Sequence, residues 1–310
     1  MAFKTFCQLF SRLIMVKQTL FALPFAYIGV LFAFKTVIDQ GTGAGADRVT
    51  GEIATKFGIE TMHNVSIWIF VTLALVSART CGMSFNRVID AKIDKKNPRT
   101  KNRVLPAGEL SHSIVWVMAV ISALILIFSS YMLNELCFKL SFLSVFFLFT
   151  YSFFKRFSSS SHFYLGLIEA VAPIGGYIAV TGKFDIMPFI LGFIILFWIA
   201  GLDIIYAFQD IEFDKKENLH SIPAKIGREK SLTISLICYG LSASAIILAG
   251  ILSDKGIFFW IGFIGVLFLF AFQQILARKK NINESIKRIF LINTYVSPVL
   301  FFGTLLDALL

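Results

Sequence analysis

Nine long apolar runs, separated by short polar segments, dominate the pattern of hydrophobic and polar positions along the chain. A helix that crosses the hydrocarbon core of a bilayer needs about 20 largely apolar residues, and each run is close to that length. The pattern predicts an all-α membrane protein, a bundle of nine transmembrane helices in a single domain that spans residues 1–310. The predicted spans are residues 18–34, 65–85, 113–133, 137–154, 163–181, 187–206, 231–252, 257–277 and 289–309.

The composition supports this interpretation and removes other classes. Apolar residues make up 57% of the chain, charged residues only 15%, and the mean hydropathy is +0.77. Soluble domains are typically about 45–50% apolar and about 25% charged, so disordered, collagen-like and disulfide-scaffold proteins are excluded. The net charge of +10 does not imply a nucleic-acid partner, and the lipid bilayer is the partner that the composition indicates.

The basic residues predict how the chain lies in the membrane. With nine spans, 22 of the 29 Lys and Arg residues fall at the N-terminus or in the segments after even-numbered spans. Because basic residues concentrate on the cytoplasmic side, we expect a cytoplasmic N-terminus and an external C-terminus in the bacterial cytoplasmic (inner) membrane. Segment 36–63 is then external, and both a short interfacial helix and a solvated connector remain open for it.

Two polar stretches follow the second and sixth runs, on the predicted cytoplasmic side. At 100° per residue, positions 79, 83, 86, 90 and 94 fall within an arc of roughly 80°, and positions 203, 206, 210 and 214 form a second such arc. Each predicted helix therefore presents two carboxylates spaced i, i+4 on one face. The pairs are Asp90 with Asp94 and Asp210 with Asp214.

Paired acids without nearby His or Cys favour a hard, oxygen-seeking cation. Mg²⁺ usually binds through one or two carboxylates together with substrate phosphate, and the basic residues Arg103, Lys155 and Arg156 are suited to meet phosphate oxygens directly. The pattern thus predicts a diphosphate held by two Mg²⁺ ions. The competing interpretation, acids that only pair with Lys in a solvated loop, fits Glu212 and Glu217 better than the four aspartates.

Two of the ionisable residues inside the predicted spans are candidates for a role in the membrane interior. Arg79 is two turns deeper than Asn86 on the same face, and because an intramembrane charge is costly, we expect it to bind an anion; pairing with a helical neighbour or snorkelling is the alternative. Glu169 faces either the cavity or the interface. The four cysteines are expected to be packing residues, and the histidines surface or capping residues: His63, His112, His162 and His220.

Two aspartate-rich motifs resemble the signatures of UbiA-type intramembrane prenyltransferases. The first is Asn86-x-x-x-Asp90-x-x-x-Asp94, followed by Thr100-x-x-Arg103 and Gly108, and the second is Tyr206-Ala-x-Gln-Asp210-x-x-x-Asp214. The sequence Ala78-Arg79-Thr-x-Gly-Met-x-x-Asn-Arg-x-Ile-Asp is similar to the 4-hydroxybenzoate polyprenyltransferase branch of ubiquinone or menaquinone biosynthesis. Val104-Leu-Pro departs from the more common Pro-Leu after the arginine.

The resemblance implies nine helices around a central cavity, with the diphosphate of a polyprenyl donor held by two Mg²⁺ ions at the cytoplasmic mouth. By this analogy Asn86, Asp90 and Asp94 bind one ion, and Asp210 and Asp214 bind the other. The side chains implied to contact the diphosphate are those of Arg103, Tyr151, Lys155, Arg156 and Tyr206.

The acceptor implied by the resemblance is a small aromatic acid, 4-hydroxybenzoate, alkylated at C3 and anchored by Arg79. Haem farnesylation and prenylation of a glycerol phosphate lipid keep the same fold and remain open. A transporter is the alternative outside enzymes, but transporters usually place ionisable residues near the bilayer midplane, whereas here most of them cluster at one mouth.

Overall fold

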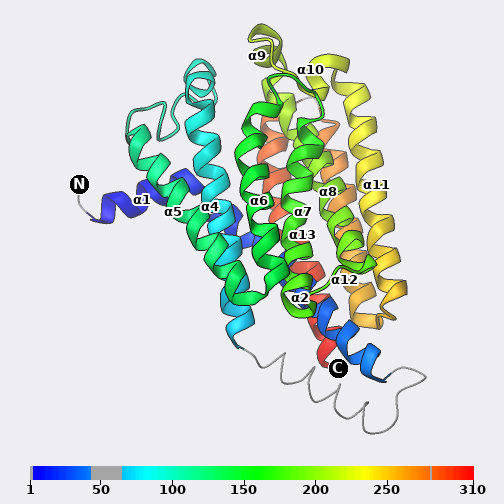
Figure 1. The fold of residues 1–310 in the computed structure, drawn as a ribbon. Helices are drawn as coiled ribbons and strands as arrows, with labels where there is room; N and C mark the ends of the chain where they lie inside the picture. The colour runs from blue at the N-terminus through cyan, green and yellow to red at the C-terminus, as the bar shows by residue number, and fades with distance from the viewer. Residues whose placement is uncertain (1–2, 43–64, 280) are drawn as a thin grey trace.

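The computed structural model describes residues 3–42, 65–279 and 281–310, and within these ranges the chain forms helices and no strands. Figure 1 shows the long helices side by side in one bundle, with the C-terminus at one end and the short helices α9 (Ile211–Lys216) and α10 (Ile222–Ile226) at the other. The all-α prediction is confirmed. The first helices are α1 (Phe3–Ile14), α2 (Val16–Thr42) and α4 (Val65–Lys96).

Several of the helices begin at a residue whose side chain caps the first turn. Ser111 and Asn134 each accept a hydrogen bond from a backbone amide three residues later, which satisfies a donor that the helix itself leaves unpaired. Polar capping residues therefore separate consecutive apolar runs. The remaining long helices are α5 (His112–Leu133), α6 (Glu135–Phe154), α7 (Ser161–Thr181), α8 (Ile186–Tyr206), α11 (Arg228–Leu252), α12 (Ile257–Ala277) and α13 (Ile282–Leu309).

Eight helices of the described chain are long and apolar enough to cross a membrane. They include every predicted span except the first, residues 18–34. That span lies in α2, whose apolar part over Ala22–Ile38 is shorter than the other eight, so the count of nine is not confirmed. Large apolar side chains on the outside of the bundle, such as Phe128 and Phe268, are more than half exposed, as expected for an integral membrane protein whose solvent is lipid.

Helix α7 lies between α2 and α8 and approaches both at glycines. A Cβ atom added to Gly176 would lie 2.0 Å from the carbonyl oxygen of Ala26, and one added to Gly29 would lie 2.1 Å from that of Pro173. On the other side, a Cβ on Gly166 would lie 2.2 Å from the carbonyl oxygen of Leu196. Small residues let membrane helices pack backbone to backbone, and here they hold α7 at the centre of the bundle.

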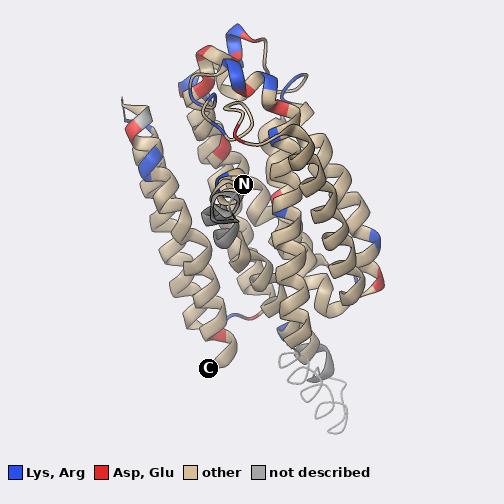
Figure 2. Cartoon of the chain, turned by 90° about the vertical axis from the view of Figure 1, so that its left-hand side faces the viewer, with Lys and Arg blue, Asp and Glu red and all other residues tan. Residues whose placement is uncertain are grey.

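Charged residues gather at the end of the bundle that holds α9 and α10, as Figure 2 shows. The loop between α4 and α5 lies at this end and packs on α1, because Leu9 and Leu13 share an apolar cluster with Leu105. The guanidinium of Arg12 binds the carboxylate of Glu109 through two hydrogen bonds of 2.6 and 2.9 Å. This end is the charged end of the molecule. Of segment 36–63, residues 43–63 lie outside the described residues.

Candidate functional site

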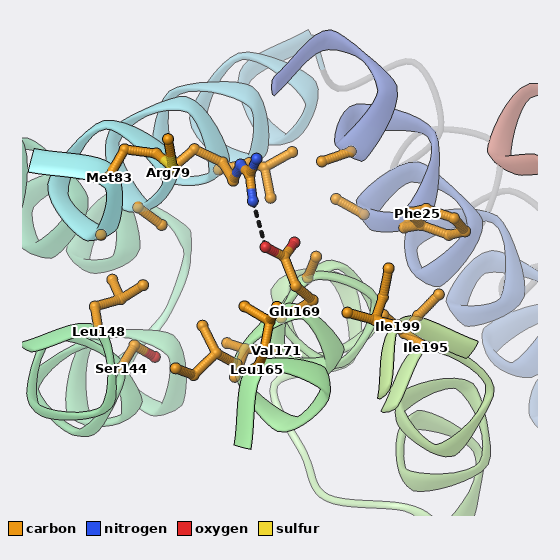
Figure 3. Close-up of a pocket in the computed structure, with 18 of the residues that line it drawn as sticks. Phe25, Arg79, Met83, Ser144, Leu148, Leu165, Glu169, Val171, Ile195 and Ile199 are labelled. Atoms are coloured by element: carbon orange, nitrogen blue, oxygen red, sulfur yellow. Dashed lines mark hydrogen bonds and ion pairs between the residues drawn. The ribbon is translucent and has the colours of Figure 1, made fainter. Parts of the chain in front are cut away.

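A cavity of about 420 Å³ lies between the helices, within the usual size range of small-molecule sites. It is lined from α2, α4, α5, α6, α7, α8 and α13. The lining joins Asn86 and Tyr206, which belong to the two predicted motifs, to the deeper pair of Arg79 and Glu169. Most of the remaining lining is apolar, including Phe25 and Leu148 (Figure 3).

Asp90 is buried on α4 and is held by side chains of α4 and of the segment after α6. The amide of Asn86, one turn earlier, donates to Asp90 Oδ2 at 2.8 Å and to Ser152 Oγ at 3.2 Å. Arg156 donates to Asp90 Oδ1 at 3.2 Å and to the carbonyl of Ile89 at 2.8 Å. The predicted helix face is confirmed, because α4 continues unbroken beyond the apolar run to Lys96.

Asp94, one turn further along, is buried and paired with the loop that follows. Arg103 donates to both of its carboxylate oxygens, at 2.9 and 2.8 Å, and the Thr100 hydroxyl donates to its backbone carbonyl at 3.0 Å. Gly108 adopts a φ of +73° and has no neighbour that a Cβ would meet, so glycine is favoured there by backbone conformation. The loop that carries Thr100 and Arg103 thus turns back toward the end of α4 and binds Asp94.

The second motif departs from the continuous helix that its spacing predicts. Helix α8 ends at Tyr206, a 3₁₀ turn, η1, covers Ala207–Asp210, and α9 begins at Ile211. Asp210 and Asp214 are therefore not an i, i+4 pair on one α-helix. The tighter turn changes the angle between residues 206 and 210, so the predicted arc holds only up to Tyr206.

Asp210 binds the loop after α4, which joins the two motifs. Arg99 donates to Asp210 through Nε at 3.0 Å and Nη2 at 2.5 Å, and Asn97 donates to it at 2.9 Å. Arg99 also donates to the Tyr206 hydroxyl at 2.7 Å. Burial lowers the pKa of Arg99, but the hydrogen bonds to Asp210 and nearby negative charges outweigh it, and the net shift of its pKa is upward.

Asp214 is buried on α9 and lies near the C-terminal end of α6. The Lys155 ammonium interacts electrostatically with both Asp214 and Asp90, while the Lys155 carbonyl accepts a hydrogen bond of 2.7 Å from the His220 amide. The ion pair of Lys96 with Glu217, at 2.5 Å, adds a second link between the motifs. Lys155 therefore lies where both predicted metal-binding segments meet.

The donor chemistry of this end fits Mg²⁺. The residues predicted to bind it offer carboxylate and amide oxygens, which are the ligands of hard cations. Within the described ranges, no three His, Cys, Asp or Glu residues are grouped closely enough to form a metal cage by themselves. Mg²⁺ usually needs only one or two carboxylates when phosphate supplies the other oxygens, so the residues fit an ion that binds together with a phosphate ligand.

Arg79 and Glu169 face each other across the cavity from α4 and α7, and a hydrogen bond joins Arg79 Nη1 to Glu169 Oε1 (Figure 3). Both side chains are 18% exposed. Glu169 therefore faces the cavity, which decides between the two positions that the sequence leaves open. Within the described chain, Arg79 Nε is buried without a hydrogen-bond partner. Tyr151 of α6 lines the same cavity.

The sequence did not reveal the role of His162, which is 3% exposed rather than a surface residue. Its Nδ1 lies 2.7 Å from Oδ2 of Asp203, a cavity-lining residue, and its Nε2 accepts a hydrogen bond of 3.2 Å from the Ile222 amide. Because Nε2 accepts, Nδ1 carries the proton and donates it to Asp203. The sequence offered one indication that this region belongs to the site, because Asp203, the partner of His162, lies two turns before Asp210 on the predicted helix face.

Arg99 and Asn97 also belong to the site, although no role was predicted for them from the sequence. Both bind Asp210 across the gap between the motifs. Their position directly after the first motif, within Asn97-Pro-Arg99-Thr, was the feature of the sequence that could have indicated a role in the site. Of the cysteines, Cys81, Cys137 and Cys238 are buried and free, in agreement with a packing role.

Comparison with known proteins gives consistent results. Residues 57–295 match the UbiA prenyltransferase family. A 4-hydroxybenzoate octaprenyltransferase from Shewanella pealeana is 28% identical over 258 residues, which are 83% of this chain and 88% of that protein. The protein with the same name from Nitrosomonas europaea is 29% identical over 248 residues, which are 80% of this chain and 84% of the relative.

Solved structures share the fold. The apo structure of a UbiA homologue from Aeropyrum pernix has a TM-score of 0.79 and 26% identity, and the match covers 94% of this chain and 98% of that one. A UbiA homologue from Archaeoglobus fulgidus, solved with GPP and Mg²⁺ bound, has a TM-score of 0.57 over 96% of this chain and 99% of its own. At 15% identity, this second similarity is one of fold.

Proposed function

The chain belongs to the UbiA prenyltransferase family, and from this premise we propose that it transfers a polyprenyl group from polyprenyl diphosphate to C3 of 4-hydroxybenzoate. The observation that carries the proposal is one cavity whose lining includes a residue of each aspartate-rich motif, Asn86 and Tyr206, together with the deeper Arg79. The names of the relatives from Shewanella pealeana and Nitrosomonas europaea support the same acceptor. The product would enter quinone biosynthesis.

At the charged end, the residues divide between metal and diphosphate. Asn86, Asp90 and Asp94 would hold one Mg²⁺, and Asp210 and Asp214 a second. When bound, Mg²⁺ supplies positive charge that stabilises the departing diphosphate. The side chains that bind the diphosphate oxygens are those of Arg103, Tyr151, Lys155, Arg156 and Tyr206.

The present ion pairs explain how these arginines stay in place without substrate. Arg156 and Arg103 each neutralise an aspartate, so neither acids nor bases are left as uncompensated buried charges. In the complex, the carboxylates would hold Mg²⁺ and the guanidiniums would turn to phosphate oxygens, which suit their geometry. Charge is then balanced both before and after the substrate binds.

The apolar part of the cavity receives the allylic end of the donor and keeps water away. The allylic carbon–oxygen bond breaks, and the diphosphate leaves with the electron pair. The ring carbon ortho to the acceptor hydroxyl then bonds to the allylic carbon, and the ring loses one proton. The cavity lining includes aromatic rings such as those of Phe25 and Trp198, whose centroids lie 4.9 Å apart, and a cation is stabilised where it meets the face of such a ring.

Arg79 anchors the acceptor in this proposal. A guanidinium binds a planar carboxylate through two parallel hydrogen bonds, and Arg79 has a buried Nε that no described group occupies. The charged end lies on the cytoplasmic side of the bacterial inner membrane, where the water-soluble acceptor and the diphosphate are both available. The Arg79→Lys variant should raise the acceptor KM more than the donor KM, because the lysine ammonium cannot form the two parallel hydrogen bonds that a guanidinium makes to a carboxylate.

Product analysis tests the proposal. The full-length protein in membranes is supplied with geranyl diphosphate, Mg²⁺ and, in separate reactions, 4-hydroxybenzoate, haem or a glycerol phosphate lipid. The expected product is 3-geranyl-4-hydroxybenzoate, identified by mass spectrometry, and its formation should stop with EDTA and resume with added Mg²⁺. Prenylation of haem or of the lipid without prenylation of 4-hydroxybenzoate would refute the acceptor assignment, and turnover unaffected by EDTA would refute the metal requirement.

A further inference from the structure

The contact between Arg79 and Glu169 is one-sided. Only Nη1 of the guanidinium meets the glutamate, through Oε1, and Nε of Arg79 is buried without a hydrogen-bond partner in the described chain. A guanidinium offers five N–H donors in a planar fork. Glu169 therefore occupies one corner of the fork, and the guanidinium keeps an unsatisfied donor, Nε, that a second acceptor of hydrogen bonds would satisfy.

The charge of Glu169 affects any anion that uses the remaining side. Arg79 and Glu169 together are neutral, and both lie on membrane-spanning helices where an unpaired charge is costly. An incoming carboxylate would gain the Nε hydrogen bond but would lie beside a second negative charge. Asp203, held by His162, also lines the cavity and adds to this repulsion.

We propose that Glu169 positions Arg79 and limits how tightly it binds the acceptor carboxylate, and this rests on the proposed function. Glu169 holds Arg79 through Nη1, leaves the Nε side for the acceptor carboxylate, and by its own charge weakens the binding of that carboxylate. Without acceptor, it keeps the guanidinium paired while the apolar chain of the donor fills the cavity. After transfer, it limits how strongly Arg79 retains a product that still carries the carboxylate.

The Glu169→Gln variant separates charge from position. The glutamine amide keeps the size of the side chain and an oxygen that accepts from Arg79 Nη1, but it removes the negative charge. We expect benzoate to bind purified full-length Glu169→Gln protein about tenfold more tightly than the wild type, as the loss of a nearby like charge in a partly buried site implies. Isothermal titration calorimetry in detergent measures this dissociation constant.

Two controls isolate the charge effect. Benzamide has the shape of benzoate without its charge, so its affinity should be the same for Glu169→Gln and the wild type. The Glu135→Gln variant removes a negative charge from an exposed ion pair with Lys139 and should leave benzoate binding unchanged. Unchanged or weaker benzoate binding by Glu169→Gln, or equal tightening for benzamide, would overturn the proposal.

The wild type provides a test that needs no variant. Because Glu169 offsets much of the charge of Arg79, benzoate should bind the wild type no more than about tenfold more tightly than benzamide. A preference of 100-fold or more would contradict the proposal. Failure of the proposed function is distinguishable, because it would appear as wild-type protein that binds benzoate as expected but does not prenylate 4-hydroxybenzoate.

Discussion

Three aspartates at the charged end each share their carboxylate with an arginine that comes from a different segment. Asp90, Asp94 and Asp210 are paired in this way, at distances between 2.5 and 3.2 Å. A buried carboxylate without such a partner would cost several kcal/mol. The arginines therefore make it energetically acceptable to place several acids together at the mouth of an apolar cavity, and they are in position to bind phosphate.

Two aspartates test the metal assignment. Asp90→Asn and Asp214→Asn should each lower kcat/KM by about 100-fold or more, because a lost metal ligand removes charge stabilisation worth several kcal/mol. Glu217→Gln, which disturbs only a partly exposed ion pair with Lys96, should change kcat/KM less than about threefold. Steady-state kinetics over a range of Mg²⁺ concentrations measures both. Near-normal activity of Asp214→Asn with full Mg²⁺ dependence would disprove the two-ion arrangement.

His162 is expected to position Asp203 and the segment before α10. His162→Ala removes both hydrogen bonds and should lower kcat/KM about tenfold, since a hydrogen bond to a charged group is worth about 1.5–3 kcal/mol. His162→Gln should recover most of the activity, because its amide can donate to Asp203 while its oxygen accepts from Ile222. Equal activity of the two variants would show that hydrogen bonding at this position is unimportant.

At the level of helices, α7 determines the shape of the cavity. It contributes Glu169 to the lining and lies against α2 and α8 through glycines whose backbone touches the neighbouring helix. Any added side-chain atom at these positions would push the helices apart. The close packing of α7 thus sets how far Glu169 lies from Arg79 on α4.

The glycine contact can be tested with neighbouring residues. Gly176→Ala would place a Cβ 2.0 Å from the Ala26 carbonyl oxygen, whereas Gly175→Ala meets nothing within 4 Å. Overpacking typically costs about 1–3 kcal/mol, so Gly176→Ala should lower the thermal midpoint of the detergent-solubilised protein by several degrees and Gly175→Ala should not. Equal midpoints for the two variants would argue against backbone contact between α2 and α7.

The whole molecule is strongly asymmetric. Lys, Arg, Asp and Glu concentrate at one end of the bundle, and the C-terminus lies at the other (Figures 1 and 2). The asymmetry agrees with the 22 of 29 basic residues that the spans assign to one side. Such an arrangement favours a charged end in the cytoplasm, where basic residues accumulate.

Cysteine labelling tests this orientation. In a cysteine-free background, Lys216→Cys at the charged end and Asp254→Cys in the exposed turn between α11 and α12 should respond oppositely to a membrane-impermeant maleimide. We expect intact spheroplasts to label only Asp254→Cys and inverted membrane vesicles to label only Lys216→Cys. The reverse pattern would place the charged end outside the cell and would overturn the assignment of the N-terminus to the cytoplasm.

The sequence by itself determined the features that depend on neighbouring residues. Run length and apolar content predicted the long helices, because a helix that spans lipid must satisfy its own backbone groups and expose apolar side chains. Helical periodicity correctly placed Asn86, Asp90 and Asp94 on one face. The same rule failed beyond Tyr206, where the 3₁₀ turn interrupts the helix.

Only the tertiary structure decided which distant groups meet. Glu169 lies 90 residues from Arg79, and Asp203 lies 41 residues from His162, so no local pattern pairs them. Charge and burial indicate that each group needs a partner, but several candidates exist along the chain, and the glycine-mediated packing of α7 selects among them. The sequence thus determined that this is a membrane-embedded helical protein with two acidic motifs, and helix packing decided the charge balance inside its cavity.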